Sequence, residues 1–311
     1  MKYGILCLIA ILIFFPALAF AENGVSYSPL RESQTPLGPF PTNQEIAQDM
    51  ISIRESGIGI IRIFETGGML EIILQEAEKN KINVAIGINI ISDNSKNLEN
   101  IQDIISRSQK YSNVDSYIIG NNPLWDKTIT LTKLLEYLQY AHSMTGKKIT
   151  TINGFKIWND KQYFGLADYV DYILVDMFTI YDTKSPVEAV KIIKTQHDKL
   201  QETFNTPIVI ETGWSTIHST KLAQDTFRDE LTKTKINHFL FEWADESYKS
   251  NPIESGFGIY DSNRVEKPIY TSQEIISAST AVVVGSASAI GGVEVVRWIL
   301  SSGSQWGKPV Y

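Results

Sequence analysis

The chain of 311 residues contains a single cysteine, Cys7, which lies in an apolar N-terminal stretch. One thiol cannot form a disulfide within the chain, and thiol-based metal sites need several cysteines. Cys7 also lacks the preceding small residues that lipid attachment at a cleavage site requires. We therefore expect neither disulfides nor thiol chemistry.

Histidine and clusters of positive charge are scarce as well. The four histidines lie far apart, without the short spacings of metal ligands, so we expect no catalytic metal and no other cofactor. The formal net charge is -7, and the basic residues are scattered rather than clustered. This pattern disfavours a nucleic-acid partner. Separately, we expect the protein to be a monomer.

The N-terminal residues have the composition of an export signal. Lys2 precedes an apolar run from Ile5 to Leu18, and Ala19-Phe20-Ala21 is the small-x-small pattern of a signal peptidase site. The run is shorter than the roughly 20 residues that a membrane-spanning helix needs, although a retained anchor is an alternative. We predict a signal peptide over residues 1–21 and a secreted or extracytoplasmic protein.

The C-terminal residues form a different segment, rich in Ala, Val, Gly and Ser. Between Ser277 and Leu300 the only charged residues are Glu294 and Arg297, so a membrane-spanning helix is one possibility. Small polar residues and two adjacent glycines favour a surface helix or a partly ordered tail instead. We predict a small apolar tail over residues 273–311 and leave its association with a membrane open.

Between these ends, β-branched runs alternate with amphipathic stretches, as in repeated βα units. Eight strands are predicted, at Gly24–Ser28, Gly59–Phe64, Asn83–Ile90, Val114–Gly120, Lys148–Asn153, Val170–Met177, Pro207–Glu211 and His238–Trp243. Helices are predicted at Asn43–Glu55, Met69–Lys79, Leu98–Lys110, Leu131–Met144, Pro186–Phe204 and Lys221–Thr232, with Thr42 and Ser185 as caps. Strands covered on both faces, without a Gly-rich phosphate turn, favour a single α/β domain, a (β/α)8 TIM barrel, over residues 22–272.

The residues at the predicted C-terminal ends of these strands are the candidates for a functional site, because barrel enzymes hold their active sites there. They are Tyr27, Arg62 to Glu65, Asn121, Asn122, Asn153, Asp176, Glu211 and Glu242. The most informative run is Pro207–Trp214, an apolar strand that ends in Glu211 with Trp214 three residues later. A carboxylate near an aromatic ring is typical of a sugar-cleaving site, because an aromatic face suits the C–H face of a pyranose.

In the order and spacing of these strand-end motifs, the chain resembles glycoside hydrolase family 17. This family comprises the secreted β-1,3-glucanases and related glucan-remodelling enzymes. The resemblance covers most of Gly24 to Lys267. It is carried by Gly24–Pro29, Ile61–Phe64, Gly120-Asn121, Glu211–Ser215, Phe241–Glu246 with Lys249, and Gly258–Asp261. No single motif is specific to this family. Their order and spacing on eight successive βα units support the fold assignment.

The resemblance implies roles for individual residues. Glu211 corresponds to the catalytic nucleophile, and Asn121 to the residue that hydrogen-bonds the sugar 2-hydroxyl. Tyr27 and Glu242 correspond to residues that line the cleft. The predicted substrate-binding residues are Tyr27, Arg62, Asn121, Trp214, Glu242 and Trp243.

The sequence departs from the family pattern at the acid/base position, where Asn122 stands in place of Glu. Phe64 and Tyr248 also replace the usual Tyr and Trp. A retaining glycosidase needs a carboxyl about 5 Å from the nucleophile to protonate the leaving oxygen and then to deprotonate water. An amide has no such proton to give, and general acid/base catalysis contributes about 10²–10⁴-fold.

Three hypotheses follow. The barrel binds a β-glucan, β-1,3-linked, with hydrolysis impaired or absent. Alternatively, it is an active retaining endo-β-glucanase or transglycosylase whose acid is Asp126, Glu65, Glu242 or Glu246. In the third, it is a non-catalytic scaffold or interaction protein.

Structural interpretations stand beside these functional ones. Glu211 is alternatively a structural carboxylate paired with Arg62. Trp214 and Trp243 are either core aromatics or a sugar platform. The pair Asn121-Asn122 also suits a strand-to-loop turn, and Asp176 is either a cleft residue or a solvated strand end.

Overall fold

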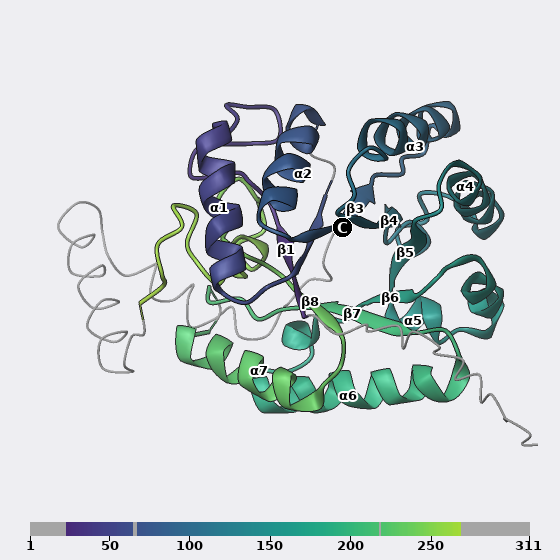
Figure 1. The fold of residues 1–311 in the computed structure, drawn as a ribbon. Helices are drawn as coiled ribbons and strands as arrows, with labels where there is room; N and C mark the ends of the chain where they lie inside the picture. The colour runs from purple at the N-terminus through teal and green to yellow at the C-terminus, as the bar shows by residue number, and fades with distance from the viewer. Residues whose placement is uncertain (1–22, 65–66, 218, 269–311) are drawn as a thin grey trace, which may run out of the picture.

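Eight parallel strands close into a barrel in the order of the chain, and β8 pairs back onto β1. The structure is a computed structural model that describes residues 23–64, 67–217 and 219–268 (Figure 1). The strands are β1 Gly24–Tyr27, β2 Ile60–Ile63, β3 Asn83–Ile88, β4 Val114–Asn121, β5 Lys148–Gly154, β6 Ile173–Asp176, β7 Ile208–Thr212 and β8 His238–Leu240. The predicted single-domain (β/α)8 barrel is confirmed.

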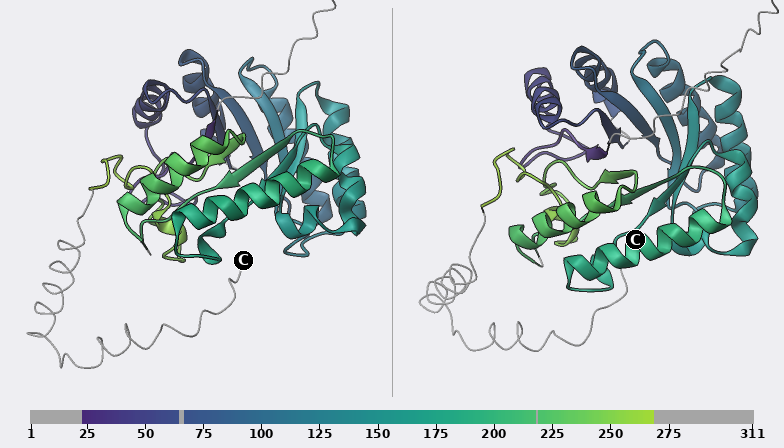
Figure 2. Two further views of the ribbon diagram at one scale, coloured as in Figure 1. Left: turned by 90° about the horizontal axis from the view of Figure 1, so that it is seen from below. Right: turned by 60° about the horizontal axis from the view of Figure 1, so that its bottom comes forward.

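The helices surround this barrel, and Figure 2 shows α6 and α7 side by side along one flank. They are α1 Asn43–Glu55, α2 Leu70–Lys79, α3 Asn94–Ser108, α4 Leu131–Met144, α5 Phe155–Trp158, α6 Pro186–Thr203 and α7 Lys221–Thr234. Short 3₁₀ segments lie at Gly67–Met69, Lys161–Tyr169, Thr179–Tyr181 and Glu254–Gly256. Helix α3 begins at Asn94 rather than at the predicted Leu98, because the Asp93 side chain accepts a hydrogen bond from the Ser95 backbone N and caps the helix.

The predicted caps form as expected. The Thr42 hydroxyl accepts a hydrogen bond from the Glu45 backbone N (3.2 Å), while the Glu45 carboxylate accepts one from the Thr42 backbone N (2.7 Å). The Ser185 hydroxyl accepts a hydrogen bond from the Glu188 backbone N and so caps α6. These local bonds fix where α1 and α6 begin, and therefore how far the preceding loops extend over the barrel mouth.

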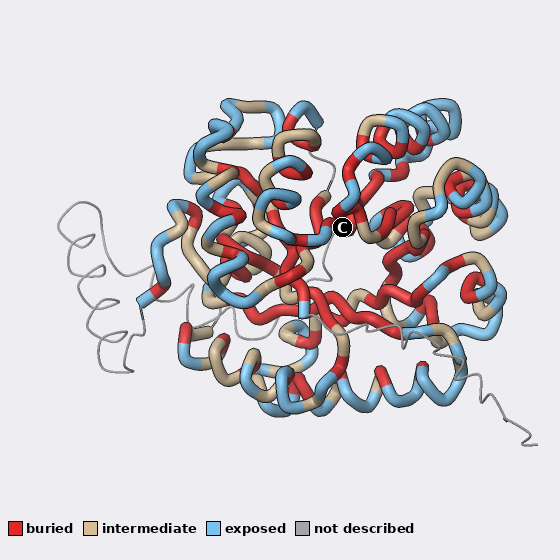
Figure 3. The backbone as a smooth tube through the Cα atoms, in the orientation of Figure 1, coloured by how far each residue is buried: buried red, intermediate tan, exposed pale blue. Residues whose placement is uncertain are grey.

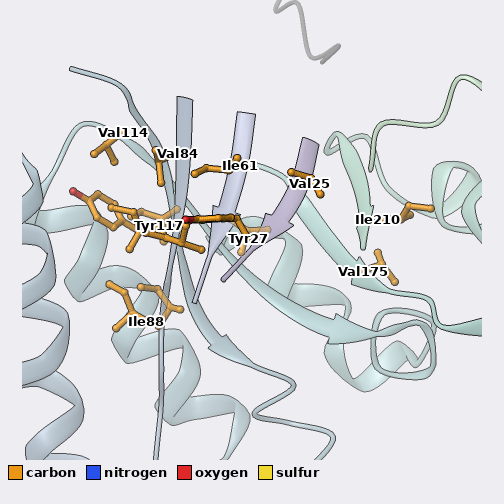
Figure 4. Close-up of a cluster of buried hydrophobic side chains, with 14 of the residues drawn as sticks. Val25, Tyr27, Ile61, Val84, Ile88, Val114, Tyr117, Val175 and Ile210 are labelled. Atoms are coloured by element: carbon orange, nitrogen blue, oxygen red, sulfur yellow. The ribbon is translucent and has the colours of Figure 1, made fainter. Parts of the chain in front are cut away.

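The core has two layers, because successive side chains on a strand point to opposite faces of the sheet. One layer fills the barrel interior with Ala85, Ile118, Ile152, Tyr172, Leu174, Val209 and Phe239. The other lies between strands and helices and includes Val25, Tyr27 and Ile61 (Figure 4). In Figure 3 the strands are mostly buried, while exposed residues follow the outer faces of the helices. Side chains that point inward near the C-terminal strand ends are therefore the ones that reach the mouth.

Gly213, just beyond β7, has no room for a side chain. A Cβ there would lie 2.0 Å from the Phe241 carbonyl oxygen and 2.8 Å from the Phe257 ring. We expect Gly213→Ala to lower the free energy of unfolding by about 3 kcal/mol, because the β7 and β8 ends would have to separate. Gly146→Ala is the control, since a Cβ there meets nothing within 4 Å. Equal stabilities of the two variants in chemical denaturation would contradict this prediction.

The predicted signal peptide (1–21) and the tail (273–311) lie outside the described residues. Within residues 23–268, leaving aside the gaps at 65–66 and 218, no helix is long and apolar enough to cross a membrane. The domain boundaries proposed from the sequence therefore stay predictions.

Candidate active site

A cavity of about 620 Å³ opens at the C-terminal ends of the strands. Its volume is in the range of ordinary ligand sites. Asn121, Asn122, Asp176 and Glu211, which come from the ends of β4, β6 and β7, lie in its wall. Among the described residues, no group of three or more His, Cys, Asp or Glu side chains could hold a metal ion. The side chains that line this mouth include carboxyls, amides, aromatic rings and the Lys249 ammonium.

Glu211 is a buried and anchored carboxylate of the site. It is 3 % exposed and touches the cavity. The Ser26 hydroxyl donates to Glu211 Oε1 (2.5 Å), and Arg62 Nη1 pairs with Oε2. Ser26 and Arg62 are neighbours in the register of β1 and β2, so both donors come from rigid strands. The anticipated pairing with Arg62 exists, but Glu211 also faces the cavity, which a purely structural carboxylate would not need to do.

Arg62 lies behind the cavity wall and holds side chains that belong to it. Its side chain is 1 % exposed and does not belong to the cavity wall. Besides pairing with Glu211, its Nη2 donates to Asn121 Oδ1 (3.1 Å), and its guanidinium lies 4.5 Å from the centre of the Phe64 ring. This placement does not fit the predicted substrate-binding role of Arg62. The guanidinium instead fixes the orientations of Glu211 and Asn121.

Asn122 and Asp176 are joined across the mouth. Asn122 follows directly on β4 with a φ of 53°, and its Nδ2 donates to Asp176 Oδ2 (2.6 Å). Asp176 ends β6 beside Glu211 in the strand register. Burial, and secondarily the negative charge of Glu211, raises the pKa of Asp176 to about 7. Of the two alternatives for Asp176, the structure selects the cleft residue.

The four anticipated substitute acids have different surroundings. Asp126 lines the cavity, and burial raises its pKa. Glu246 also lines the cavity. Burial acts to raise its pKa, but the charge of Lys249 and hydrogen bonds with Glu242, Lys249 and Ser28 together lower it. Glu242 is 1 % exposed, lies outside the cavity wall and is held by Lys249 (3.3 Å), while burial raises its pKa well above the usual range. Glu65 lies outside the described residues.

On β1, the side chain that contacts Glu211 is that of Ser26 and not that of Tyr27. The Tyr27 ring packs in the outer layer, and its hydroxyl donates to Asp49 Oδ2 on α1 (2.9 Å), so Tyr27 borders the cavity without presenting its hydroxyl to it. Ser26 points inward to Glu211. Sequence reasoning missed Ser26, although the alternation of side chains along a strand was a signal that could have found it.

The two tryptophans lie in the core. Trp214 stacks on Phe227 of α7 with ring centres 5.5 Å apart, and Trp243 packs against Tyr260 at 4.7 Å. Both are 2 % exposed, and neither belongs to the cavity wall. The predicted sugar platform of Trp214 and Trp243 does not fit this placement, because α7 and the segment after β8 cover both indoles.

Phenylalanines form the aromatic wall instead. Phe178, Phe241 and Phe257 line the cavity and pack edge to face, with ring centres 5.2 to 5.4 Å apart. The Phe64 ring also packs edge to face against Phe241, with ring centres 6.2 Å apart. Tyr181 and Tyr248 lie further out in the same wall. The cavity therefore combines an apolar aromatic face with the polar floor of Glu211, Asp176 and the two asparagines.

A parallel eight-stranded barrel with carboxyls and amides at its mouth is the architecture of TIM-barrel glycosidases. Residues 24–259 match the family model of the BtgE/BtgC glycoside hydrolase domain. Because the match spans most of the chain, the protein belongs to this family. No curated protein matched the chain in a sequence comparison.

Solved structures share the fold at low identity. The glycoside hydrolase family 17 β-1,3-glucanosyltransferase of Rhizomucor miehei superposes with a TM-score of 0.68 and 18 % identity, over 80 % of this chain and 96 % of that one. Its active-site mutant in complex with laminaritriose gives 0.69 and 17 % over the same shares. A β-galacturonidase of Eisenbergiella tayi gives 0.64 and 14 %, over 82 % of this chain but 50 % of that one. The resemblance to glycoside hydrolases seen in the sequence is thus confirmed.

Proposed function

We propose that the cavity binds a β-linked glucan, with β-1,3 as the favoured linkage, and that Glu211 attacks its anomeric carbon as the nucleophile of a retaining glycosidase or glucan transglycosylase. One observation carries the proposal: Glu211 is a buried carboxylate, held by Ser26 and Arg62, that opens onto the cavity. Membership of a glycoside hydrolase family supports it, as does the likeness to a glucanosyltransferase bound to laminaritriose.

The neighbouring groups suit a pyranose. Arg62 occupies Asn121 Oδ1, which leaves the amide NH₂ of Asn121 as a donor to a sugar hydroxyl. The rings of Phe178, Phe241 and Phe257 offer apolar surface to the C–H faces of the sugar. Ser26 and Arg62 neutralise and orient Glu211, so its free lone pairs are aimed without reorganisation when the intermediate forms.

Asn122 favours a second candidate function, namely glucan binding with little turnover. Its amide stands where the family resemblance expects the acid/base, and it cannot protonate a sugar leaving group. On this alternative the protein holds a glucan chain without shortening it.

The variant Asn122→Glu separates the two candidates on laminarin-type oligosaccharides. If the protein is an enzyme, as proposed, the wild type already cleaves or transfers these substrates, and Asn122→Glu gains no activity over it. If it is a binding protein, the wild type is inert and Asn122→Glu gains activity, by up to the roughly 10²–10⁴-fold that a general acid contributes. Product analysis by chromatography gives the readout. Absence of glucan binding would contradict both candidates and favour the scaffold hypothesis.

The proposal extends to location. Residues 1–21 direct the protein out of the cytoplasm, and residues 273–311 are a candidate for membrane attachment. Protein recovered outside the cytoplasm should begin at Glu22 when its N-terminus is sequenced, and an N-terminus at Met1 would count against export by cleavage.

A further inference from the structure

Asp176 lies between the two positions that define a retaining site. It ends β6 beside Glu211 of β7 in the strand register. Its Oδ2 accepts a hydrogen bond from Nδ2 of Asn122, at 2.6 Å, from beyond the end of β4. All three side chains line one cavity. A carboxyl oxygen is therefore one hydrogen bond away from the place where the acid/base residue was expected.

The charges around Asp176 differ from those around Glu211. Arg62 pairs with Glu211 and donates to Asn121, and its positive charge acts on Asp176 only from a distance, where it lowers the pKa of Asp176. In the part of the chain that the structure describes, Asp176 has Asn122 as its hydrogen-bond donor and takes part in no ion pair. The other charged groups that act on it are Glu211 and Asp126, both negative, and burial together with Glu211 raises the pKa of Asp176 to about 7. Two carboxyls in such different surroundings suit a division into nucleophile and acid.

We propose that Asp176 is the proton donor and acceptor of this site, with Asn122 as the residue that positions it. This inference rests on the proposed function, in which Glu211 is the nucleophile. It names a different acid from the four expected from the sequence.

The proposed steps balance as follows. The Asp176 carboxyl gives its proton to the glycosidic oxygen while the bond from that oxygen to C1 breaks and Glu211 forms a bond to C1. The leaving sugar departs as an alcohol, and the Asp176 carboxylate is stabilised by the Asn122 N–H. Asp176 then takes a proton from water, or from a hydroxyl of a second glucan chain, whose oxygen attacks C1 and releases Glu211. A Glu at position 122 would place another negative charge beside Asp176, whereas the amide does not.

The test compares Asp176→Asn, Asp126→Asn and wild type on two substrates: laminarin-type oligosaccharides, and 2,4-dinitrophenyl β-glucoside, whose leaving group needs no proton. We expect Asp176→Asn to lower kcat/KM for the oligosaccharides by about 10²–10⁴-fold. The same variant should still release a burst of dinitrophenol, then turn over slowly, and azide should restore turnover because this anion needs no general base. Asp198→Asn, an exposed change on α6, is the control.

The pH profile adds a readout that a structural role would not change. Wild-type activity on oligosaccharides should fall as the pH rises through about 7, because Asp176 loses its proton, and Asp176→Asn should lack this limb. The inference is wrong if Asp176→Asn keeps oligosaccharide activity within threefold of wild type, or if Asp126→Asn alone removes the fall in activity at high pH.

A 2-deoxy-2-fluoro analogue of the aryl glucoside tests separately whether Glu211 is the nucleophile. If mass spectrometry finds no adduct on Glu211, both the proposed function and the role of Asp176 are wrong. If the adduct forms but Asp176→Asn keeps its oligosaccharide activity, only the role of Asp176 is wrong.

Discussion

Replacing Glu211 with glutamine should lower turnover of both the oligosaccharides and the aryl glucoside by at least about 10³-fold, because an amide does not form the glycosyl ester. The loss on the aryl substrate is the distinguishing part. A missing acid is bypassed by a good leaving group, but a missing nucleophile is not. Steady-state rates of dinitrophenol release, with the stability of the variant checked by thermal unfolding, give the measurement.

Glu188→Gln is the matched control for this substitution, since Glu188 is an exposed carboxylate on α6. It should leave both activities unchanged. If Glu211→Gln retained more than a tenth of the wild-type rate on the aryl glucoside, another group would be the nucleophile, and the ion pair with Arg62 would be the whole role of Glu211.

The largest effect on stability is expected for Arg62→Met. Removal of the guanidinium leaves the Glu211 carboxylate in the barrel without its cation and frees Asn121 from its anchor. Breaking one side of a buried pair costs about 3–5 kcal/mol of the free energy of unfolding. Urea denaturation of the variant and of the wild type measures the difference.

Two comparisons make this prediction specific. Arg107→Met removes an arginine that pairs with Glu71 and Asp103 at the surface, and should cost at most about 1 kcal/mol. The double variant Arg62→Met/Glu211→Gln should recover part of the loss, because no unpaired charge is then left inside the barrel. A cost for Arg62→Met as small as that for Arg107→Met would show that Glu211 is not held by this pair.

Much of the fold could be predicted because its signals are local. Runs of Ile and Val bounded by turns gave eight strands, and amphipathic stretches with caps such as Thr42 and Ser185 gave the helices between them. The largest difference between a predicted and an observed helix start is at α3. The residues that follow Asp93 are helical, but they are polar and show no apolar periodicity that could have indicated a helix. Strand ends also indicated the mouth, and Glu211, Asn121 and Asn122 do lie in the cavity wall.

The remaining parts of the site could not be read from neighbours in sequence. Asn122 and Asp176 are 54 positions apart, and their strands β4 and β6 are separated by β5, so no local pattern links the two side chains. The tryptophans looked like sugar-binding residues because they follow Glu211 and Glu242 in sequence. Their neighbours in space, Phe227 and Tyr260, belong to segments whose docking depends on the closed barrel.

The sequence by itself determined the barrel and the strand that carries Glu211, because these follow from hydrophobic periodicity along the chain. The family resemblance added the expectation of an amide, Asn122, at the acid/base position. Only the tertiary structure decided that Ser26 rather than Tyr27 contacts Glu211, that Arg62 pairs with Glu211 outside the cavity wall, and that Asp176 lies against Asn122. The physical reason is barrel closure, which brings inward side chains of distant strands within hydrogen-bond distance. Among the described residues, it leaves Glu211 ion-paired with Arg62 and Asp176 outside any ion pair.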